Sequence, residues 1–305
     1  MSDKSKIEWT DATWNPVTGC RQIPGAKGAP SGCDRCYAKT LLDTRMRANP
    51  TSARYGLPFE TVLMHSERLD QPLRWKRPRR IFVNSLSDLF HEHVTDAFIA
   101  KVFATMAAAP QHSFQVLTKR PERMRNLLRS KIRASDNVWL GTSVSTKADE
   151  WRIGSLVWVP AKVRFLSVEP LLGPIELGPL AMIRGGIQWV IVGGESGRGA
   201  RPMHPAWARS VRDQCAAAGV PFFFKQWGAW AEADPHEATH LLRIDGQLVE
   251  REAATQRYEG VGRTVEEDLV DRGHPGWVRV RRLDKRLTGR SLDGRTWDEF
   301  PVGAA

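Results

Sequence analysis

Three of the four cysteines lie close together near the beginning of the chain. Cys33 and Cys36 are separated by two residues, so both sulfurs can bind one metal centre, and the glycine- and proline-rich segment before them lets Cys20 supply a third ligand. Three thiolates fit a [4Fe-4S] cluster with one open iron position or a structural zinc that lacks one ligand; unligated thiols are the remaining explanation. We favour the cluster, because no fourth cysteine or histidine lies nearby in the sequence.

The fourth cysteine, Cys215, stands apart from this loop in AWARSVRDQCAAAGV, a segment of helical composition. A small apolar thiol suits a buried helix face, so Cys215 is not expected to be a ligand. The chain begins without the apolar stretch of a signal peptide and contains no run of about 18 apolar residues. We therefore predict a cytoplasmic protein that does not span a membrane and whose cysteines form no structural disulfide.

A series of short apolar runs predicts the strands that would position the cysteine loop. The segments between them have helical composition, as in Asp96–Ala108 and Pro205–Ala218, and an earlier strand near Thr13–Thr18 leads into the loop. Strand and helix alternation of this kind predicts an α/β fold, a complete or partial (β/α) TIM-type barrel with an iron–sulfur cysteine loop after the first strand. The six later strands are expected at Arg80–Asn84, Ser113–Leu117, Val138–Gly141, Val163–Ser167, Gln188–Val192 and Pro221–Phe224.

The chain changes character after Gly228. Residues 1–228 are predicted to form the barrel, and residues 229–305, which have few apolar runs and many charges, a C-terminal appendage packed on it. The stretch Arg279–Arg290 (RVRRLDKRLTGR) is strongly basic and is either a solvated face or a phosphate-binding strip.

Polar residues follow nearly every predicted strand, and in barrels the chemistry lies at these carboxyl ends. We expect them to meet in one polar pocket. The catalytic candidates are Glu169, Glu195 and Tyr37; the cofactor-binding candidates are Asn84, Ser85, Asp88, Thr142, Ser143, Gly193, Gly194 and Ser196; the nucleic-acid-binding candidates are Lys119, Arg120, Lys225, Trp227, Arg281 and Arg282. Taken singly, each has a structural explanation as well: Asp88 as a helix cap, Glu169 as an ion-pair partner of Lys119 or Arg120, and Gly193-Gly194 as a tight turn.

The charge balance points to a polyanionic partner. The chain of 305 residues carries a formal net charge of +11, which favours nucleic acid, DNA first, over a merely basic surface. Twelve tryptophans against three tyrosines is an unusual ratio, but composition alone does not decide whether these rings pack in a core, stack on bases or relay electrons.

Many sequence blocks resemble a phage-associated bacterial family of uncharacterised three-cysteine proteins. The resemblance covers nearly the whole chain, through IEWTDATWNPVTGC, GCDRCYA, RIFVNSLSDLFHE, FQVLTKRPERM, WLGTSV, SVEPLLGPI, VGGESGRGARPM, FFFKQWG and LDGRTWDEFP. That family is regarded as a distant relative of the radical S-adenosylmethionine enzymes, among them the spore photoproduct lyases. The resemblance implies a barrel and a [4Fe-4S] cluster held by Cys20, Cys33 and Cys36.

Two departures concern the cosubstrate. Radical enzymes of this kind use C-x3-C-x2-C, whereas twelve residues separate the first two cysteines here. Their Gly-Gly-Glu motif follows the second strand, whereas Gly193-Gly194-Glu195 follows a much later one. S-adenosylmethionine therefore stays possible but doubtful, whereas the two departures affect the expectation of a cluster less.

We expect an iron–sulfur enzyme acting on nucleic acid, a lyase that repairs pyrimidine photodimers in DNA by electron-transfer or radical chemistry. This step rests in part on analogy with the spore photoproduct lyases. The alternatives are a radical-type enzyme that modifies a nucleobase or nucleoside, and a non-catalytic nucleic-acid-binding protein with structural zinc.

Overall fold

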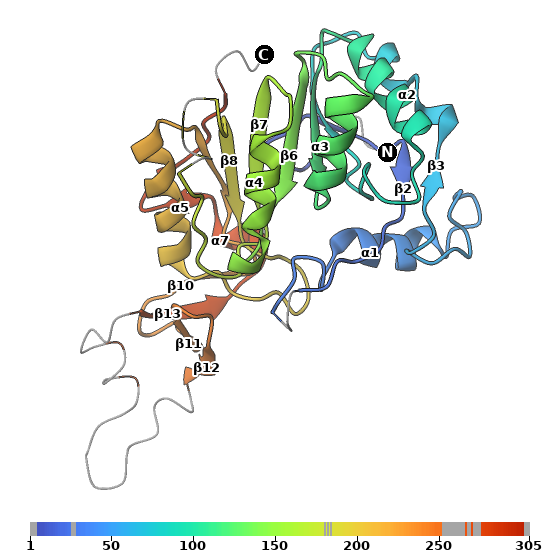
Figure 1. Cartoon of the computed structure of the whole chain (residues 1–305). Coiled ribbons are helices and arrows are strands. Elements are labelled where there is room, and N and C mark those ends of the chain that lie inside the picture. Colours follow the sequence, from blue (N-terminus) through green and yellow to red (C-terminus); the bar gives the residue numbers. More distant parts are fainter. Residues whose placement is uncertain are drawn as a thin grey trace, which may run out of the picture.

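A seven-stranded parallel sheet forms the centre of the computed structural model (Figure 1). The structure describes residues 5–25, 29–179, 185–251 and 276–301, together with residues 181, 183, 266 and 270. The strands stand in the order β1-β4-β5-β6-β7-β8-β9, so each new strand adds to the same edge of the growing sheet. They are β1 (Ala12–Trp14), β4 (Arg80–Val83), β5 (Ser113–Thr118), β6 (Val138–Ser143), β7 (Val163–Val168), β8 (Trp189–Gly193) and β9 (Phe222–Gln226).

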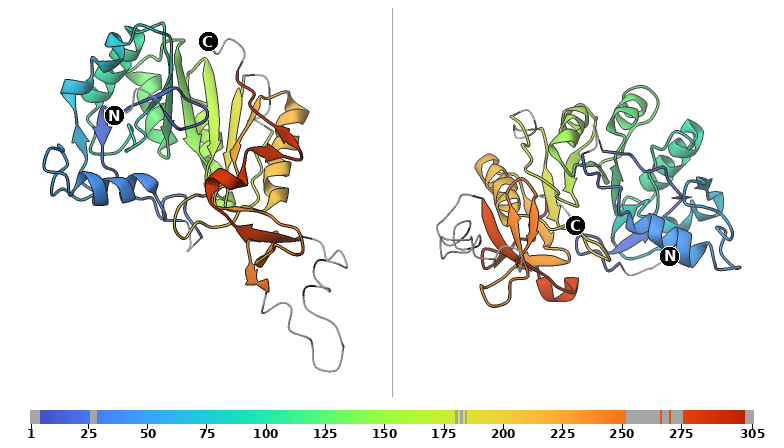
Figure 2. Two further views of the ribbon diagram at one scale, coloured as in Figure 1. Left: turned by 180° about the vertical axis from the view of Figure 1, so that it is seen from behind. Right: turned by 90° about the horizontal axis from the view of Figure 1, so that it is seen from below.

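The sheet curls into a half-barrel, which confirms the partial form of the predicted barrel and not the complete one (Figure 2). In the described part of the chain, β1 and β9 remain the two edges and do not pair with each other. Helices cover the outer face: α2 (Asp96–Ala107), α3 (Pro121–Ser130), α4 (Trp151–Val157) and α5 (Pro205–Ala218). The helix α5 begins at Pro205 and ends at Gly219, whose φ of 64° is left-handed. None of the helices in the described ranges has the length and apolar composition to cross a membrane.

Aromatic side chains fill the inner face of the half-barrel. Trp9, Trp139 and Trp189 pack there with Phe165 and Phe223 in a buried cluster that is separate from the larger core beneath the helices. The rings meet mostly edge to face or at a tilt, as between Trp139 and Trp189, with centroids 5.9 Å apart. Three of the twelve tryptophans therefore serve as packing in the barrel interior.

Short elements between β1 and β4 carry the cysteine loop and its support. They are β2 (Val17–Thr18), α1 (Tyr37–Leu41), the π-helix η2 (Leu42–Met46), β3 (Leu63–Met64) and the 3-10 turns η3 (Ser66–Arg68) and η4 (Gln71–Arg74); a further 3-10 turn, η5 (Lys147–Asp149), precedes α4. Arg54, fully buried, donates to the carbonyls of Thr18, Pro58 and Thr61 and so ties these turns together.

After β9 the chain forms a second, antiparallel sheet in the order β10-β13-β11-β12 (Figure 1). The final residues then return to the half-barrel, where Asp298 bridges Phe223 and the Glu299 carbonyl accepts from Trp189 Nε1 at 2.8 Å. The division into residues 1–228 and 229–305 stays a prediction. The remaining elements are β10 (Trp230–Glu232), β11 (His240–Arg243), β12 (Leu248–Glu250), β13 (Trp277–Arg282), α7 (Lys285–Thr288), β14 (Ser291–Leu292) and β15 (Arg295–Thr296).

The aromatic packing on the inner face predicts that a methyl group added at Gly141 destabilises the fold. Gly141 pairs with Phe165 across β6 and β7, and a Cβ at Gly141 would lie 2.6 Å from that ring. Gly141→Ala is expected to lower the free energy of unfolding by about 1–3 kcal/mol. Gly173→Ala, where nothing lies within 4 Å of the added carbon, serves as the control. Equal urea midpoints for the two variants would contradict this account of the inner face.

Candidate functional site

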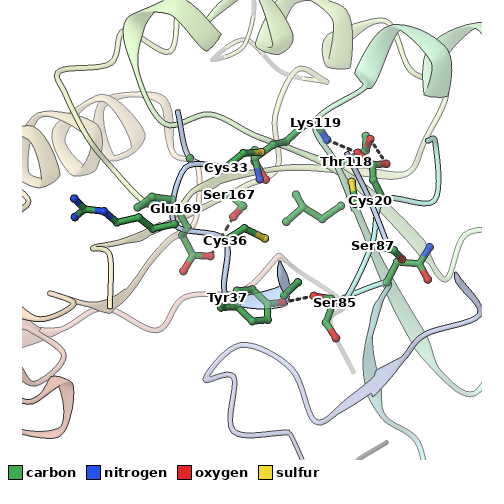
Figure 3. A pocket seen from close by; sticks show the side chains of 18 of the residues that line it. Cys20, Cys33, Cys36, Tyr37, Ser85, Ser87, Thr118, Lys119, Ser167 and Glu169 are labelled. Carbon is green, nitrogen blue, oxygen red and sulfur yellow. Dashed lines mark hydrogen bonds between the residues drawn. The ribbon is translucent and has the colours of Figure 1, made fainter. Parts of the chain in front are cut away.

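A pocket of about 470 Å³ opens at the carboxyl ends of the parallel strands. Its wall includes all three clustered cysteines, and in Figure 3 Cys20 lies on one side of the pocket and Cys33 and Cys36 lie on the other. Residues from β4, β5, β6, β7 and β9 and the turns after them complete the wall. The structure therefore brings together the cysteine loop and most of the strand-end residues predicted from the sequence.

Cys20 follows β2, whereas Cys33 and Cys36 precede α1. Gly19 turns the chain into the loop with a φ of 88°, and any side chain there would lie 2.0 Å from the Thr61 carbonyl. Ser31 Oγ accepts from the Cys33 N–H at 3.0 Å, and Asp34 Oδ2 accepts from the Ser31 N–H at 2.8 Å. Small polar side chains thus shape the tight turn that carries the last two cysteines.

Arg120 is the immediate polar neighbour of Cys20. Its Nη1 donates to Cys20 Sγ at 3.7 Å and pairs with Asp88 Oδ2 at 3.0 Å. Burial raises the pKa of the Cys20 thiol to about 12, and the Asp88 charge acts in the same direction, while Arg120 opposes both. Without a metal the thiol form is favoured, and a bound metal would have to displace its proton.

Three thiols of this kind can serve as ligands of a metal ion or of an iron–sulfur cluster. A zinc site needs ligands that converge on one point, and across the described ranges no group of three or more His, Cys, Asp or Glu side chains does so. A [4Fe-4S] cluster binds each thiolate through a different iron atom, so its ligands stand around a space. Cys20, Cys33 and Cys36 border such a space (Figure 3).

A carboxylate and an ammonium group face each other across the barrel rim. Glu169, just after β7, pairs with Lys225 of β9 at 2.8 Å, and Ser167 Oγ donates to the other carboxylate oxygen at 3.1 Å. Burial by itself favours the neutral amine, but Glu169 outweighs it and raises the pKa of Lys225. Glu169 thus pairs with neither Lys119 nor Arg120, the partners considered from the sequence.

The last residue of β8, Gly193, and the glycine after it, Gly194, allow close packing. A Cβ at Gly194 would lie 1.9 Å from the Trp227 carbonyl, and one at Gly193 would lie 2.9 Å from Glu169 Oε1. Glu195 is then held by Arg201, whose guanidinium nitrogens lie 2.6 and 2.9 Å from its two oxygens. This bidentate pair already engages both oxygens of Glu195, one of the catalytic candidates from the sequence.

Residues at and after the carboxyl ends of β4 and β5 form another part of the pocket wall. Asp88 accepts from Thr118 Oγ1 at 2.7 Å and from the Lys119 N–H at 3.1 Å, so it orders the turn after β5 rather than capping a helix. Tyr37, next to Cys36, donates its hydroxyl to the Ser85 carbonyl. The remaining predicted cofactor contacts that line the pocket are Asn84, Ser143, Gly194 and Ser196.

Several predicted site residues lie elsewhere. Thr142 is fully buried and donates to the Thr118 carbonyl, and Trp227 is buried against Phe224 with its Nε1 bonded to the Ser291 carbonyl. Neither lines the pocket, and their expected roles in cofactor and nucleic-acid binding stay predictions. Gly193 does not line the pocket either, because the Glu169 side chain occupies the space beside it.

The predicted nucleic-acid contacts in the basic stretch Arg279–Arg290 lie on the second sheet. Arg281, on β13, pairs with Glu237 at 3.0 Å, and Arg282 donates to the Gly197 carbonyl at 3.1 Å. Both belong to the second sheet and not to the pocket wall. Their proposed contact with nucleic acid stays a prediction.

Sequence reasoning missed three residues that organise the site. Arg201 holds Glu195, Ser167 orients Glu169, and Arg152, buried behind Ser143, donates to its carbonyl at 3.0 Å. Ser167 was the last residue of a predicted strand, so its place at the rim could have been inferred. The arginines gave no such signal, because a sequence does not reveal which carboxylate each one meets.

The Lys225–Glu169 pair predicts a large stability cost for a single substitution. Lys225→Met should lower the free energy of unfolding by about 1–3 kcal/mol, because it leaves a half-buried carboxylate without its basic partner. Lys162→Met is the control, since Lys162 meets Asp136 at an exposed pair, 3.2 Å apart, whose loss should cost less than about 1 kcal/mol. Urea unfolding measures both.

The same pair predicts how that cost varies with pH. A raised lysine pKa stabilises the fold fully below the unfolded value, about 10.4, and the contribution is lost only as pH rises through the folded pKa. The difference between wild type and Lys225→Met should therefore stay constant from about pH 6 to about pH 9. A difference that shrinks across this range would show a lowered pKa and contradict the assignment.

The protein is distantly similar to several solved structures. A cysteine-to-serine mutant of spore photoproduct lyase matches with 14% identity and a TM-score of 0.41, over 88% of this chain and 76% of that one. Spore photoproduct lyase complexed with dinucleoside spore photoproduct matches with 12% identity and a TM-score of 0.37, over 70% and 62%. At these scores neither match assigns this chain a substrate or a reaction. No curated protein matches the chain.

Residues 4–301 match the family DUF5131, described as "Protein of unknown function", and the chain belongs to that family.

Proposed function

We propose that this protein is an iron–sulfur enzyme that acts on nucleic acid. In this proposal Cys20, Cys33 and Cys36 hold a [4Fe-4S] cluster. The observation that carries it is the position of the three thiols, which border one pocket at the strand ends with space left beside them. Three thiolates would hold three irons of such a cluster and would leave the fourth without a protein ligand from this loop. When bound, the cluster supplies one-electron chemistry.

The pocket walls suit a flat, partly polar substrate. Leu117 and Phe82 give an apolar surface for a ring, while Lys225 and Glu169 present a donor and an acceptor for its edge. Gln226, 95% buried, keeps its Oε1 without a partner among the described residues and adds one more acceptor. A nucleobase has this combination of faces and edges.

The finer form of the proposal is repair of pyrimidine photodimers in DNA. One added electron weakens the carbon–carbon bonds that link the two bases, so a one-electron donor beside the pocket can start their cleavage. A base within a duplex cannot reach this pocket, so the lesion must leave the stack, which costs least where pairing is already damaged. Lys119, which has no ion pair within the described residues, lies at the rim where a phosphate would pass.

The role of S-adenosylmethionine is not supported by the Glu195 geometry. Glu195 belongs to a Gly-Gly-Glu sequence that follows a later strand than in the radical enzymes, and Arg201 already binds both of its oxygens. An amine would have to displace a bidentate guanidinium. An external reductant or light therefore agrees better with this site.

The cluster is tested by metal analysis of the protein purified without oxygen. Wild type should contain iron and sulfide and absorb visible light, whereas Cys33→Ala should lose most of its iron. Cys215→Ser is the matched control: Cys215 is buried in α5 outside the pocket, so this variant should keep its iron. Stoichiometric zinc without iron in wild type would overturn the proposal and leave the zinc protein as the explanation.

Nucleic-acid binding is tested by salt titration. Each phosphate contact releases counterions, so Lys119→Ala should weaken DNA binding and reduce the slope of log K against log salt by about 1. Lys101→Ala, which removes an exposed lysine from α2 on the outer face, should leave the slope unchanged. Identical slopes in all three proteins would exclude Lys119 from the interface. Equal affinity for intact and dimer-containing DNA would favour base modification over repair.

A further inference from the structure

The cysteine loop contains little regular structure of its own. Between β2, which ends at Thr18, and α1, which begins at Tyr37, the described residues form only turns and isolated bridges. A loop of this kind is mobile unless side chains from other elements hold it. Ligands for a cluster must nevertheless stand at defined positions, so the contacts that fix the loop decide whether they do.

Arg120, from the turn after β5, holds the beginning of the loop. Besides its contact to Cys20 Sγ, its Nη2 donates to the Arg21 carbonyl at 3.3 Å. The guanidinium is itself oriented by Asp88 at 3.0 Å and by Glu92 at 3.5 Å. This arginine therefore links a backbone group and a sulfur of the loop to the rim of the sheet.

Arg201, from the turn after β8, holds the other end. Its Nη1 pairs with Asp34 Oδ2 at 2.9 Å, and its Nη2 donates to the Ser31 carbonyl at 3.0 Å. Glu195 fixes this guanidinium through the bidentate pair, and it also accepts from the Arg201 N–H at 2.9 Å. Ser31 and Asp34 enclose the turn that carries Cys33.

We infer that Arg120 and Arg201 are positioning residues that clamp the cysteine loop from two sides of the half-barrel. Asp88 and Glu195 orient the two guanidinium groups. Neither arginine is then free to bind phosphate, which gives Arg120 a different role from the one expected from the sequence. A lysine cannot replace either residue, because a single ammonium group does not reproduce two directed contacts.

The clamp is tested first on the metal-free protein by hydrogen–deuterium exchange. Arg201→Lys should speed exchange roughly tenfold in residues 31–36, where the amides of Ser31 and Cys33 depend on this turn, and should leave residues 19–22 unchanged. Arg120→Lys should instead speed exchange in residues 19–22 and leave exchange in residues 31–36 unchanged. Arg74→Lys, at an exposed pair with Asp70, is the control and should change neither segment. Unchanged exchange at both ends in the two rim variants would overturn the inference.

A second measurement separates the two arginines and rests on the proposed cluster. Both variants should lower the iron content of reconstituted protein. In the remaining loaded fraction, Arg120→Lys should make the reduction potential more negative, because it removes a hydrogen bond to a ligand sulfur, whereas Arg201→Lys should not shift it. A merely structural role would move neither potential. If wild type binds no cluster, the proposed function fails, while the exchange result still decides the clamp.

Discussion

The parallel direction of the central strands is the constraint on which the site depends. Because every strand from β4 to β9 runs the same way, the residues that follow them meet at one edge of the sheet. Asp88, Glu169, Glu195 and Lys225 are far apart in the sequence, and all of them line the same pocket as Cys20. The half-barrel does not need to close for this to happen; it needs only enough curvature to turn the inner face toward a common space.

Ion pairs between side chains at the carboxyl ends of the strands determine which charged groups there are available to a ligand. Three buried or half-buried carboxylates each have a basic partner: Asp88 with Arg120 and Glu169 with Lys225, each from another strand or strand end, and Glu195 with Arg201 of the same segment after β8. Charges at this depth must be paired, since an isolated one would lose its hydration without compensation. The pairs therefore act mainly as fixed hydrogen-bonding groups, and the proposed attraction of nucleic acid would have to come from cations outside them.

The inner aromatic cluster determines from which side the pocket is open. Trp9, Trp189, Phe165 and Phe223 fill the barrel interior beneath it, and Phe300 from the last described residues packs on the same rings. The interior at that level is consequently occupied by side chains, and the free volume lies at the strand ends, next to the cysteine loop. A ligand that enters there meets the thiols and the rim before any apolar core.

The sequence by itself determined most strands of the parallel sheet and the edge of that sheet, its carboxyl end, at which the candidate site residues lie. The strands predicted at Arg80–Asn84 and Val163–Ser167 appear as Arg80–Val83 and Val163–Val168, because alternating strands and helices leave a clear apolar period. It left open whether the barrel closes, since that depends on whether the edges β1 and β9 meet. It also gave no sign of the second sheet. Only the tertiary structure decided that Glu169 meets Lys225 and that Arg120 and Arg201 hold the cysteine loop, because strand order and sheet curvature choose which side chains become neighbours.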